Sequence, residues 1–437
     1  MATTKLSRTI GTPTSGTKFT VSAWVKGSMA EGRILTSING NSSQTWVELQ
    51  NSGAFRIANY VGSYNMQLIT TRLFRDPSAW YNFVIAFDTT QVTDTNRVKL
   101  YVNGVQETSF STTTYPSQNL VLKYGVSGQT FNVGAKDTDT YWNGLMSYTA
   151  FVDGTAYDAS YFGETNAATG IWKINTSPSV TYGTNGCFLK MDTSSPGSDT
   201  SGNNNTFTAS GTPTLAEDNA SNNLATLNPL NAYYTNSTFS NGNTTFASGN
   251  SSSGTVGNIL LNTGKWYWEV KAVSKAGGGD NYAIGIQGQD ATATNQFPGD
   301  QSTGWMFYGG GNYYNSGSGT SAGVTYTAGD IIGVALDCTN NKLYFSKNGT
   351  FILSGNPSTG ANGISITAPA SVSLGGYYPS QTFWENSTSG TFSINFGNGY
   401  FGTTAVSSAG TNASSNGIFE YDVPANFTAL STKGLNS

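Results

Sequence analysis

The chain carries the same hairpin pattern twice, once at 83–104 and once at 331–349. In each copy an apolar run stops at an aspartate, a short polar loop follows, and an alternating run ends in Asn-Gly. The aspartates are Asp88 and Asp337, and the turns are 103–104 and 348–349. Asn-Gly tolerates positive φ at both central turn positions, which makes it the strongest short-range signal for a β-hairpin. The repetition therefore predicts two related all-β domains in tandem, and folds of that kind mostly bind other molecules.

The composition limits the possible partners. The 437 residues suffice for two or three domains that each bury a core. Only 10% of them are charged, against roughly 25% in an ordinary soluble domain, and Gly, Ser, Thr and Asn take their place. The net charge of −4 and the absence of any Lys/Arg cluster argue against a nucleic-acid partner and against an anionic membrane surface. No apolar run approaches the roughly 20 residues of a membrane span.

The chain has no histidine and two cysteines, Cys187 and Cys338. Without histidine it lacks the commonest metal ligand and the usual base at neutral pH, which excludes Ser-His-Asp triads and His-zinc sites. Each cysteine stands in an apolar context in a different half of the chain, which predicts buried free thiols rather than a disulfide.

Short alternating runs divided by Gly and Asn turns are typical of a sandwich or barrel, and they occur in two sets. Between them, stretches such as 201–205 and 217–223 contain few apolar residues. The sequence therefore predicts a first sandwich, a connecting segment, a second sandwich and a C-terminal segment that packs on the second sandwich; their ranges are 1–175, 176–232, 233–400 and 401–437. Four tryptophans lie within expected strands and are predicted to be core residues: Trp24, Trp266, Trp268 and Trp305.

The two sets resemble known families. The first set resembles the laminin-G-like, concanavalin-type jelly roll in residues 19–26, 76–81, 88–91 and 98–104, although that family usually has His where this chain has Asn82. The second set is similar to the SPRY domain, itself a concanavalin-like sandwich, in residues 264–270, 304–305, 329–334 and 343–349. The resemblance implies an all-β chain of two tandem concanavalin-like jelly-roll β-sandwiches, laminin-G-like and then SPRY-like.

Several motifs in and around the connecting segment, and one near the C-terminus, carry a further resemblance. The chain is similar to structural proteins of tailed, marine-type bacteriophages, on motifs that occur in order at 160–165, 168–172, 182–186, 199–203, 223–230 and 424–430. This similarity implies a virion protein made in the host cytoplasm, and the N-terminus accordingly lacks the apolar core of a secretory signal peptide. It also implies other virion proteins as partners, and a homotrimer is one option.

Three functions are compatible with that resemblance. The first is a tail-fibre or receptor-binding appendage that recognises host-surface glycans through aromatic and Asn-rich loops. The second is a capsid decoration or head-fibre protein, and the third is a glycan-cleaving enzyme. We expect no enzymatic activity, because glycosidases of this fold need two facing carboxylates. The closest match to such a carboxylate pair in the sequence is Glu420-Tyr421-Asp422, in the C-terminal segment. Glu269 is the only acidic residue on its expected strand.

Aromatic side chains beside amides are how a neutral surface binds sugar, by stacking on C–H faces and hydrogen bonding to hydroxyls. Three groups of such residues are candidate ligand-binding residues. They are Asn312, Tyr313 and Tyr314; Tyr377, Tyr378 and Trp384; and Tyr60, Tyr64 and Asn65. The alternative for each group is packing against neighbouring loops or subunits.

No cofactor is expected, with one open option. Asp137 and Asp139, with Asp153 nearby, supply the oxygen ligands that Ca²⁺ prefers in lectins of the concanavalin type. The alternative is that these aspartates cap turns and bind no ion.

Overall fold

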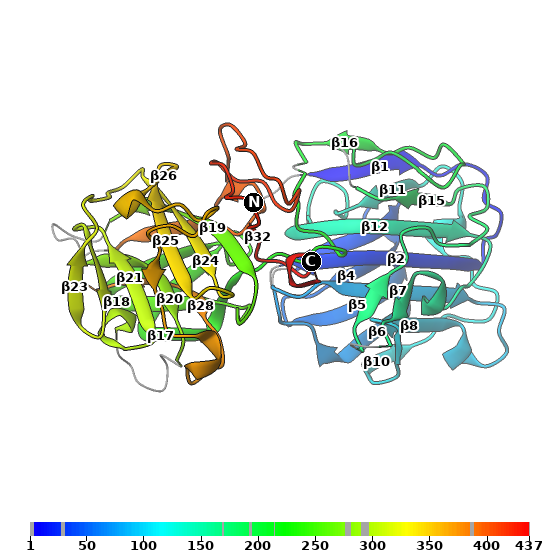
Figure 1. Ribbon diagram of the computed structural model, residues 1–437. Coiled ribbons are helices and arrows are strands. Elements are labelled where there is room, and N and C mark those ends of the chain that lie inside the picture. Colours follow the sequence, from blue (N-terminus) through cyan, green and yellow to red (C-terminus); the bar gives the residue numbers. More distant parts are fainter. Residues whose placement is uncertain are drawn as a thin grey trace. The chain divides into compact units, whose positions relative to one another are not determined.

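The computed structural model describes residues 4–27, 31–167, 170–191, 195–213, 215–275, 281–289, 297–384 and 389–436. These residues form β-strands and short 3₁₀ turns and no α-helix. They include no helix with the length and hydropathy that crossing a membrane requires. The chain divides into two compact units, Met1–Ser221 (unit 1) and Asn222–Ser437 (unit 2) (Figure 1). The all-β fold class expected from the sequence is confirmed.

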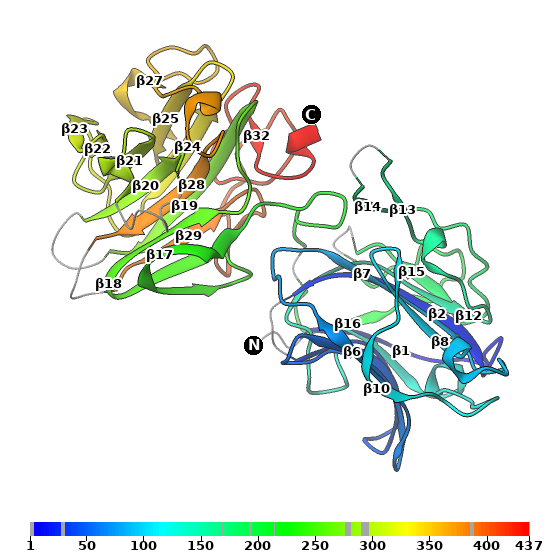
Figure 2. The same ribbon diagram turned by 90° about the horizontal axis from the view of Figure 1, so that it is seen from below.

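Unit 1 is a sandwich of two antiparallel sheets. Its strands are β1 (Lys5–Thr9), β2 (Lys18–Gly27), β3 (Gly32–Ile38), β4 (Ser43–Leu49), β5 (Ala54–Val61), β6 (Tyr64–Leu73), β7 (Tyr81–Asp88), β8 (Val98–Val102), β9 (Val105–Glu107), β10 (Phe110–Thr114), β11 (Thr130–Val133), β12 (Gly144–Asp153), β13 (Gly163–Thr165), β14 (Trp172–Ile174), β15 (Cys187–Leu189) and β16 (Thr208–Ser210). Short 3₁₀ turns are η1 (Asp94–Asn96), η2 (Lys123–Gly125) and η3 (Ala159–Tyr161). One sheet has the order β10-β6-β5-β4-β3-β11-β1-β16 and the other β15-β12-β2-β7-β8-β9, and Figure 2 shows them as separate layers.

The central strands of unit 1 are buried on both faces. Phe83, Ile85 and Phe87 of β7 point into the core between the sheets. Val84, on the opposite face of β7, packs with Ala150, Phe162 and Phe188 in a second cluster. That cluster includes half-buried aromatic residues from 157–182. The described residues between 157 and 182 therefore form a cover over the outer face of the second sheet.

Unit 2 is built around one long strand pair. Its strands are β17 (Leu227–Ser240), β18 (Thr245–Gly257), β19 (Lys265–Ser274), β20 (Tyr282–Gln287), β21 (Gly304–Tyr308), β22 (Asn312–Asn315), β23 (Ser318–Ser321), β24 (Ile331–Asp337), β25 (Lys342–Lys347), β26 (Thr350–Phe351), β27 (Ile364–Ser365), β28 (Tyr378–Phe383), β29 (Thr391–Asn395), β30 (Tyr400–Phe401), β31 (Thr404–Ala405) and β32 (Thr428–Ala429), with the 3₁₀ turns η4 (Pro298–Asp300), η5 (Ile352–Ser354), η6 (Pro369–Ser371) and η7 (Gly434–Asn436). Strand β18 pairs with β29 through Thr245–Ala247 and with β28 through Ser253–Val256. It thus joins a layer ordered β23-β22-β21-β20-β28 to a layer ordered β29-β19-β24-β25-β26.

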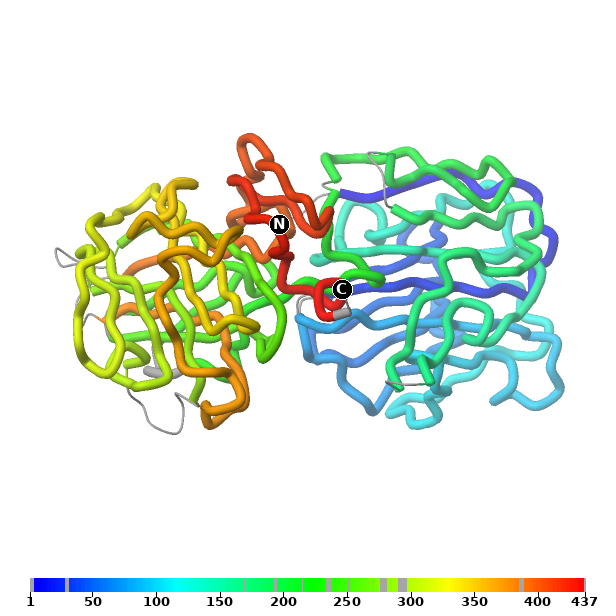
Figure 3. Tube along the Cα trace, in the orientation of Figure 1, coloured from blue at the N-terminus to red at the C-terminus, as the bar shows by residue number. Residues whose placement is uncertain are grey.

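The core of unit 2 lies between these layers and contains the aromatic residues of β19 and β21 that alternate inward, such as Trp268 and Phe307. The outer face of the β29-β19-β24-β25-β26 layer is covered by the C-terminal segment, which Figure 3 traces in red. Tyr267, Ala335 and Tyr344 of this layer form one cluster with residues of the C-terminal segment; those residues are Phe419, Val423, Phe427 and Ala429.

Both copies of the repeated hairpin are present. The turn residues Asn103 and Gly104 have φ of 48° and 81°, and Asn348 and Gly349 have φ of 47° and 82°. This near-identity is expected for a two-residue turn with positive φ at both positions. The aspartates that end the apolar runs accept hydrogen bonds from the turn that follows: Asp88 from the Thr90 and Gln91 side chains, Asp337 from the Asn340 amide.

The stretch 176–232, which the sequence analysis treats as a connecting segment, is divided between the units at Ser221 and Asn222. Its strand β15 pairs with β12, and its strand β16 pairs with β1. The stretch therefore supplies an edge strand to each sheet of unit 1 before β17 begins unit 2.

The predictions for the tryptophans and cysteines are confirmed. Trp24, Trp266, Trp268 and Trp305 are all buried. Cys187 and Cys338 are free and buried, and burial raises the pKa of each thiol to about 12.

We predict that Trp268→Ala lowers the free energy of unfolding of unit 2 by about 3–5 kcal/mol, because the side chain is fully buried in the core. Urea unfolding followed by circular dichroism measures the loss. The matched control is Leu230→Ala in the same unit, whose side chain is 95% exposed and whose truncation should change stability by no more than about 0.5 kcal/mol. A loss below about 1 kcal/mol for Trp268→Ala would contradict the core assignment.

Candidate functional site

The residues Asn312, Tyr313 and Tyr314, expected in a loop, form part of strand β22. This strand lies between β21 and β23 in the sheet. Because side chains alternate along a strand, the two tyrosines point to opposite faces. Tyr313 packs on the core, whereas the ring of Tyr314 stands 4.6 Å from that of Tyr308 on the outer face.

Tyr314 belongs to a file of four rings that we call the aromatic row: Trp384, Phe297, Tyr308 and Tyr314. The ring centroids of Trp384 and Phe297 are 5.8 Å apart, at a near-perpendicular 83°, and those of Phe297 and Tyr308 are 5.2 Å apart. Phe297 and Tyr308 also pack on Ala283 and Met306, which form the buried floor beneath the row. The row therefore lies on the outer face of the β23-β22-β21-β20-β28 layer, opposite the core.

The row combines buried and accessible rings. Phe297 is buried, Tyr308 and Tyr314 are half-buried, and Trp384 is 45% exposed. Apolar ring faces beside phenol and indole groups are suited to contact with a partner.

The Asn315 amide and backbone hydrogen bonds from Ser316 and Gly317 hold the hairpin that carries Tyr314. Asn315 Nδ2 donates to the carbonyl oxygens of Gln301, Ser302 and Gly304 at 3.2, 3.1 and 2.9 Å. These bonds tie β22 to the segment that follows η4, the turn just after Phe297. Gly299 passes between the rings, where a Cβ would lie 2.5 Å from the Phe297 ring and 3.0 Å from the Tyr314 Cβ. Only glycine fits that position without displacing the row.

The second candidate group, Tyr377, Tyr378 and Trp384, does not form one surface in the structure. Tyr377 is fully buried, its hydroxyl donates to the Thr367 carbonyl at 2.7 Å, and its ring meets the edge of Trp305. The expectation that Tyr377 binds a ligand is therefore wrong, because this side chain belongs to the core. Tyr378 is half-buried at the start of β28. Trp384, just beyond the end of β28, belongs to the same aromatic row as Tyr314. The sequence had placed these two residues in separate candidate groups.

The third group, Tyr60, Tyr64 and Asn65, lies on β5 and β6 of unit 1. The Tyr60 and Tyr64 rings are 5.1 Å apart and Tyr64 is 44% exposed. The Asn65 side-chain oxygen accepts a hydrogen bond from the Asn59 amide, which fixes its orientation. Tyr64 also approaches Trp46, at a centroid distance of 6.1 Å.

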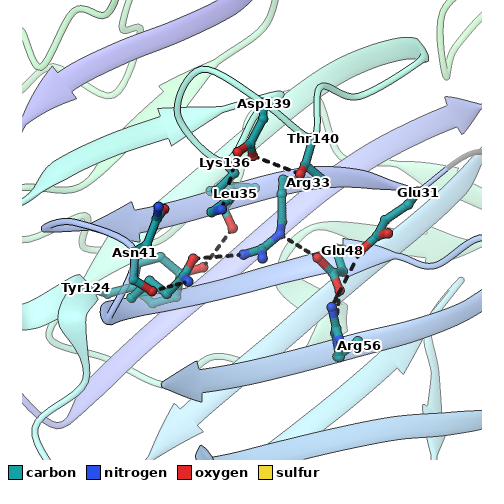
Figure 4. A network of polar contacts seen from close by, with 11 residues as sticks. Glu31, Arg33, Leu35, Asn41, Glu48, Arg56, Tyr124, Lys136, Asp139 and Thr140 are labelled. Atoms are coloured by element: carbon teal, nitrogen blue, oxygen red, sulfur yellow. Dashed lines mark hydrogen bonds and ion pairs between the residues drawn. The ribbon is translucent and has the colours of Figure 1, made fainter. Parts of the chain in front are cut away.

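Beside Trp46 lies a buried charge network. Figure 4 shows the Glu48 carboxylate between the guanidinium groups of Arg33 and Arg56. Glu31 contacts the same Arg56 nitrogen as Glu48, from the same side of Arg56. The Arg33 guanidinium stacks over Trp46 at 4.0 Å from the ring centroid. Burial lowers the pKa of Arg33 to about 10 and raises the pKa of Glu48. The paired charges keep this network a rigid support for the sheet.

The aspartates considered as optional Ca²⁺ ligands are engaged in other contacts. Asp137 is paired with Lys5 at 2.8 Å, and Asp139 with Lys136 at 3.4 Å. Asp153 is buried and accepts the backbone N–H groups of Thr14, Ser15 and Asn185. Within the described ranges, no three Asp, Glu, Cys or His side chains gather closely enough to hold a metal ion.

Glu269 is the most deeply buried carboxylate of unit 2, with none of its surface exposed. Its oxygens accept the backbone N–H groups of Glu420 and Tyr421, both at 2.9 Å, and the Tyr267 hydroxyl at 3.1 Å. Burial raises the pKa of Glu269 to about 7, against the opposing effect of these donors. The carboxylates of Glu420 and Asp422 accept hydrogen bonds from Ser407 and Thr411. All three acids thus tie down the C-terminal segment.

Phe297 and Tyr308 are the two row residues that sequence reasoning missed. Tyr308 had a usable signal: in β21, period-two alternation places Trp305 and Phe307 on one face and Met306 and Tyr308 on the other. Phe297 follows no strand, so its position depends on the tertiary structure.

The comparisons agree with this architecture. Residues 4–159 match the concanavalin A-like lectin/glucanases superfamily, and residues 265–394 match the SPRY domain. The chain thus contains two tandem concanavalin-like sandwiches, laminin-G-like and then SPRY, and the expected domain content is confirmed. Among solved structures, the SPRY domain of human HERC1 is similar, with a TM-score of 0.31 and 18% identity, over 38% of this chain and 96% of that chain.

Curated relatives are Ran-binding proteins of animals. Ran-binding protein 9 of Homo sapiens is 38% identical over 89 residues, which is 20% of this chain and 12% of that protein. The Ran-binding proteins 9/10 homolog of Drosophila melanogaster is 33% identical over 93 residues, 21% of this chain and 10% of that protein. The chain therefore matches only a small part of these relatives.

These relatives contradict the bacteriophage expectations. The comparisons give no indication of a bacteriophage origin, and the relatives are animal proteins. The predicted tail-fibre, capsid-decoration and host-glycan functions, the virion partners and the virion localisation are corrected accordingly. The motifs of the connecting stretch that suggested them have a local physical role. Asp199, for example, accepts the backbone N–H groups of Phe188, Ser201 and Asn205 and so caps a loop.

We predict that the unfolding free energy of unit 2 falls between pH 5 and pH 8 through Glu269. The folded state holds the Glu269 proton more tightly than the unfolded chain, whose carboxyl has a pKa of about 4.3, so stability present at low pH is lost as the pH rises toward 7. Urea unfolding at several pH values measures the slope.

The variant Glu269→Gln has no such proton and should show a flatter profile. Glu420→Gln, whose carboxylate is half-exposed on the same segment, is the matched control and should keep the wild-type slope. Equal slopes in Glu269→Gln and wild type would refute the assignment.

Proposed function

We propose that this chain is a non-enzymatic protein-interaction protein, and that its SPRY unit captures a short extended peptide of a partner on the aromatic row. The observation that carries the proposal is the single file of four rings with Trp384 exposed at one end. Tryptophan and tyrosine dominate the binding energy of protein interfaces, because they offer large rigid surfaces with one polar group.

The shape of the row favours a peptide over a broad protein surface. Successive ring centroids are 4.6 to 5.8 Å apart, and side chains on one face of an extended chain recur about every 6.6 Å. A peptide lying along the row would thus present alternate side chains to successive rings. The Asn315 clamp and the Ala283–Met306 floor hold the rings in place, so little order is lost on binding.

The relatives support a binding role of this kind. They are named as Ran-binding proteins, and the match lies in one small part of each. Ran is the partner in the names of those relatives, and for this chain we propose only a class of partner, a polypeptide.

We predict that peptides selected from a random library on the intact chain bind Trp384→Ala and Tyr314→Ala about 10- to 100-fold more weakly than wild type, the range expected for interface hot spots. Fluorescence anisotropy measures the affinities. Tyr64→Ala is the matched control, since its ring has nearly the same exposure as that of Trp384, 44% against 45%, but lies in unit 1. It should bind like wild type.

If the selected peptides bound Trp384→Ala and wild type equally, the aromatic row would not be the peptide-binding site. Melting temperatures should be unchanged for Trp384→Ala, because its ring is largely exposed. A large drop would show that the binding loss reports unfolding.

A further inference from the structure

Unit 1 contains a half-enclosed pocket of about 260 Å³. One wall comes from β1, β11 and β12, through Leu6, Val133 and Met146, and the other includes Leu215 and Ala216. Leu6, Val133 and Trp142 are members of the main hydrophobic core, and Met146 and Met191 pack against it. The pocket is therefore an opening of the core to the surface.

Strand β12, which lines the pocket, is irregular beside it. The pairing of β12 with β2 shifts between Ser147 and Ala150, and Tyr148 has a φ of 46°. A non-glycine residue with positive φ within a strand stores strain, and bulges of this kind redirect side chains beside binding sites. Ser147, at the start of the bulge, adds a hydroxyl-bearing side chain to a lining that mixes apolar and polar residues.

The charges at the pocket are already paired. Asp218 accepts Lys26 Nζ at 2.6 Å and the Trp80 indole N–H at 2.9 Å, both buried. Lys5, at the rim, is paired with Asp137. A charged ligand would have to compete with these pairs and would lose its own hydration. An uncharged ligand would meet apolar side chains such as Leu6 and Met146 beside neutral polar residues such as Ser147.

We propose that this pocket binds an uncharged, mostly apolar small molecule larger than benzene. Its volume exceeds the roughly 150 Å³ of an apolar protein cavity that stays dry and binds benzene. Two methionines, Met146 and Met191, line it, and their flexible side chains adapt to ligands of different shape. This site is in unit 1 and is independent of the peptide surface proposed for unit 2.

The test is calorimetric titration of the intact chain with two uncharged probes, indole and n-butylbenzene, and with indole-3-carboxylate as the charged counterpart. We expect saturable binding of at least one uncharged probe at one site per chain, and at least tenfold weaker binding of the carboxylate. Binding of neither uncharged probe, or tighter binding of the carboxylate, would overturn the proposal.

Two variants locate the site. Ala216→Phe places a ring at the pocket wall and should weaken probe binding at least tenfold. Ala209→Phe, at an exposed position of β16 outside the pocket, is the matched control and should bind as wild type does. Met146→Ala enlarges the pocket and should shift the preference toward n-butylbenzene, which keeps the test informative if Ala216→Phe fails to fold.

Unchanged probe binding in Ala216→Phe would place the probe elsewhere and refute the site. Sedimentation equilibrium of the same samples tests whether a second copy of the chain occupies the pocket instead of a small molecule. Dimers that dissociate in Ala216→Phe would show that a second copy of the chain fills the pocket, and the small-molecule proposal would fail.

Discussion

The central strands of both units are buried on both faces, and much of the remaining structure follows from this constraint. A two-layer sandwich covers only one face of each sheet, so a sheet with apolar residues on both faces needs further chain to cover it. In unit 1 that cover is formed by described residues between 157 and 182 over β7 and β12, and in unit 2 it is the C-terminal segment over β19 and β24. Irregular chain in this protein is therefore part of the core packing.

Irregular covers bring unpaired backbone groups into the interior, and buried N–H groups need acceptors. A buried carboxylate serves this purpose in each unit. Asp153 accepts three backbone N–H groups in unit 1, and Glu269 accepts two in unit 2. A chain with few charged residues thus places Glu269 where it holds the C-terminal segment on a sheet. Asp153 is placed where it joins Asn185 to the loop before β2.

The cover also makes the two outer faces of unit 2 different. In unit 2 the C-terminal segment occupies the outer face of one layer, and the outer face of the other layer carries the aromatic row, where Phe297 is buried and Trp384 is accessible. The two outer faces of the same sandwich therefore have different roles, one closed by the chain itself and one presenting rings.

The sequence predicts the local features well, because they depend on neighbouring residues. Asn103-Gly104 and Asn348-Gly349 have the positive φ angles that their turns require, and Trp268 alternates into the core. The aromatic row depends on sheet order, which places β22, β21, β20 and β28 side by side. No local pattern joins Phe297 to Trp384. For Tyr377 and Tyr378, alternation predicts that only one faces outward, but the identity of the inner residue depends on the register of β28 with β20.

The low charge content finally constrains how this protein can recognise a partner. Several of its charged side chains are committed to internal pairs, including Lys26 with Asp218 and Arg33 with Glu48. The aromatic row and its clamp consist of rings, amides and glycines. Affinity at such a surface comes from ring burial and from hydrogen bonds to neutral groups, which salt screens little. Partner selection should therefore depend on the shape and spacing of apolar side chains in the peptide, and a change of ionic strength should alter it far less than the loss of a single ring.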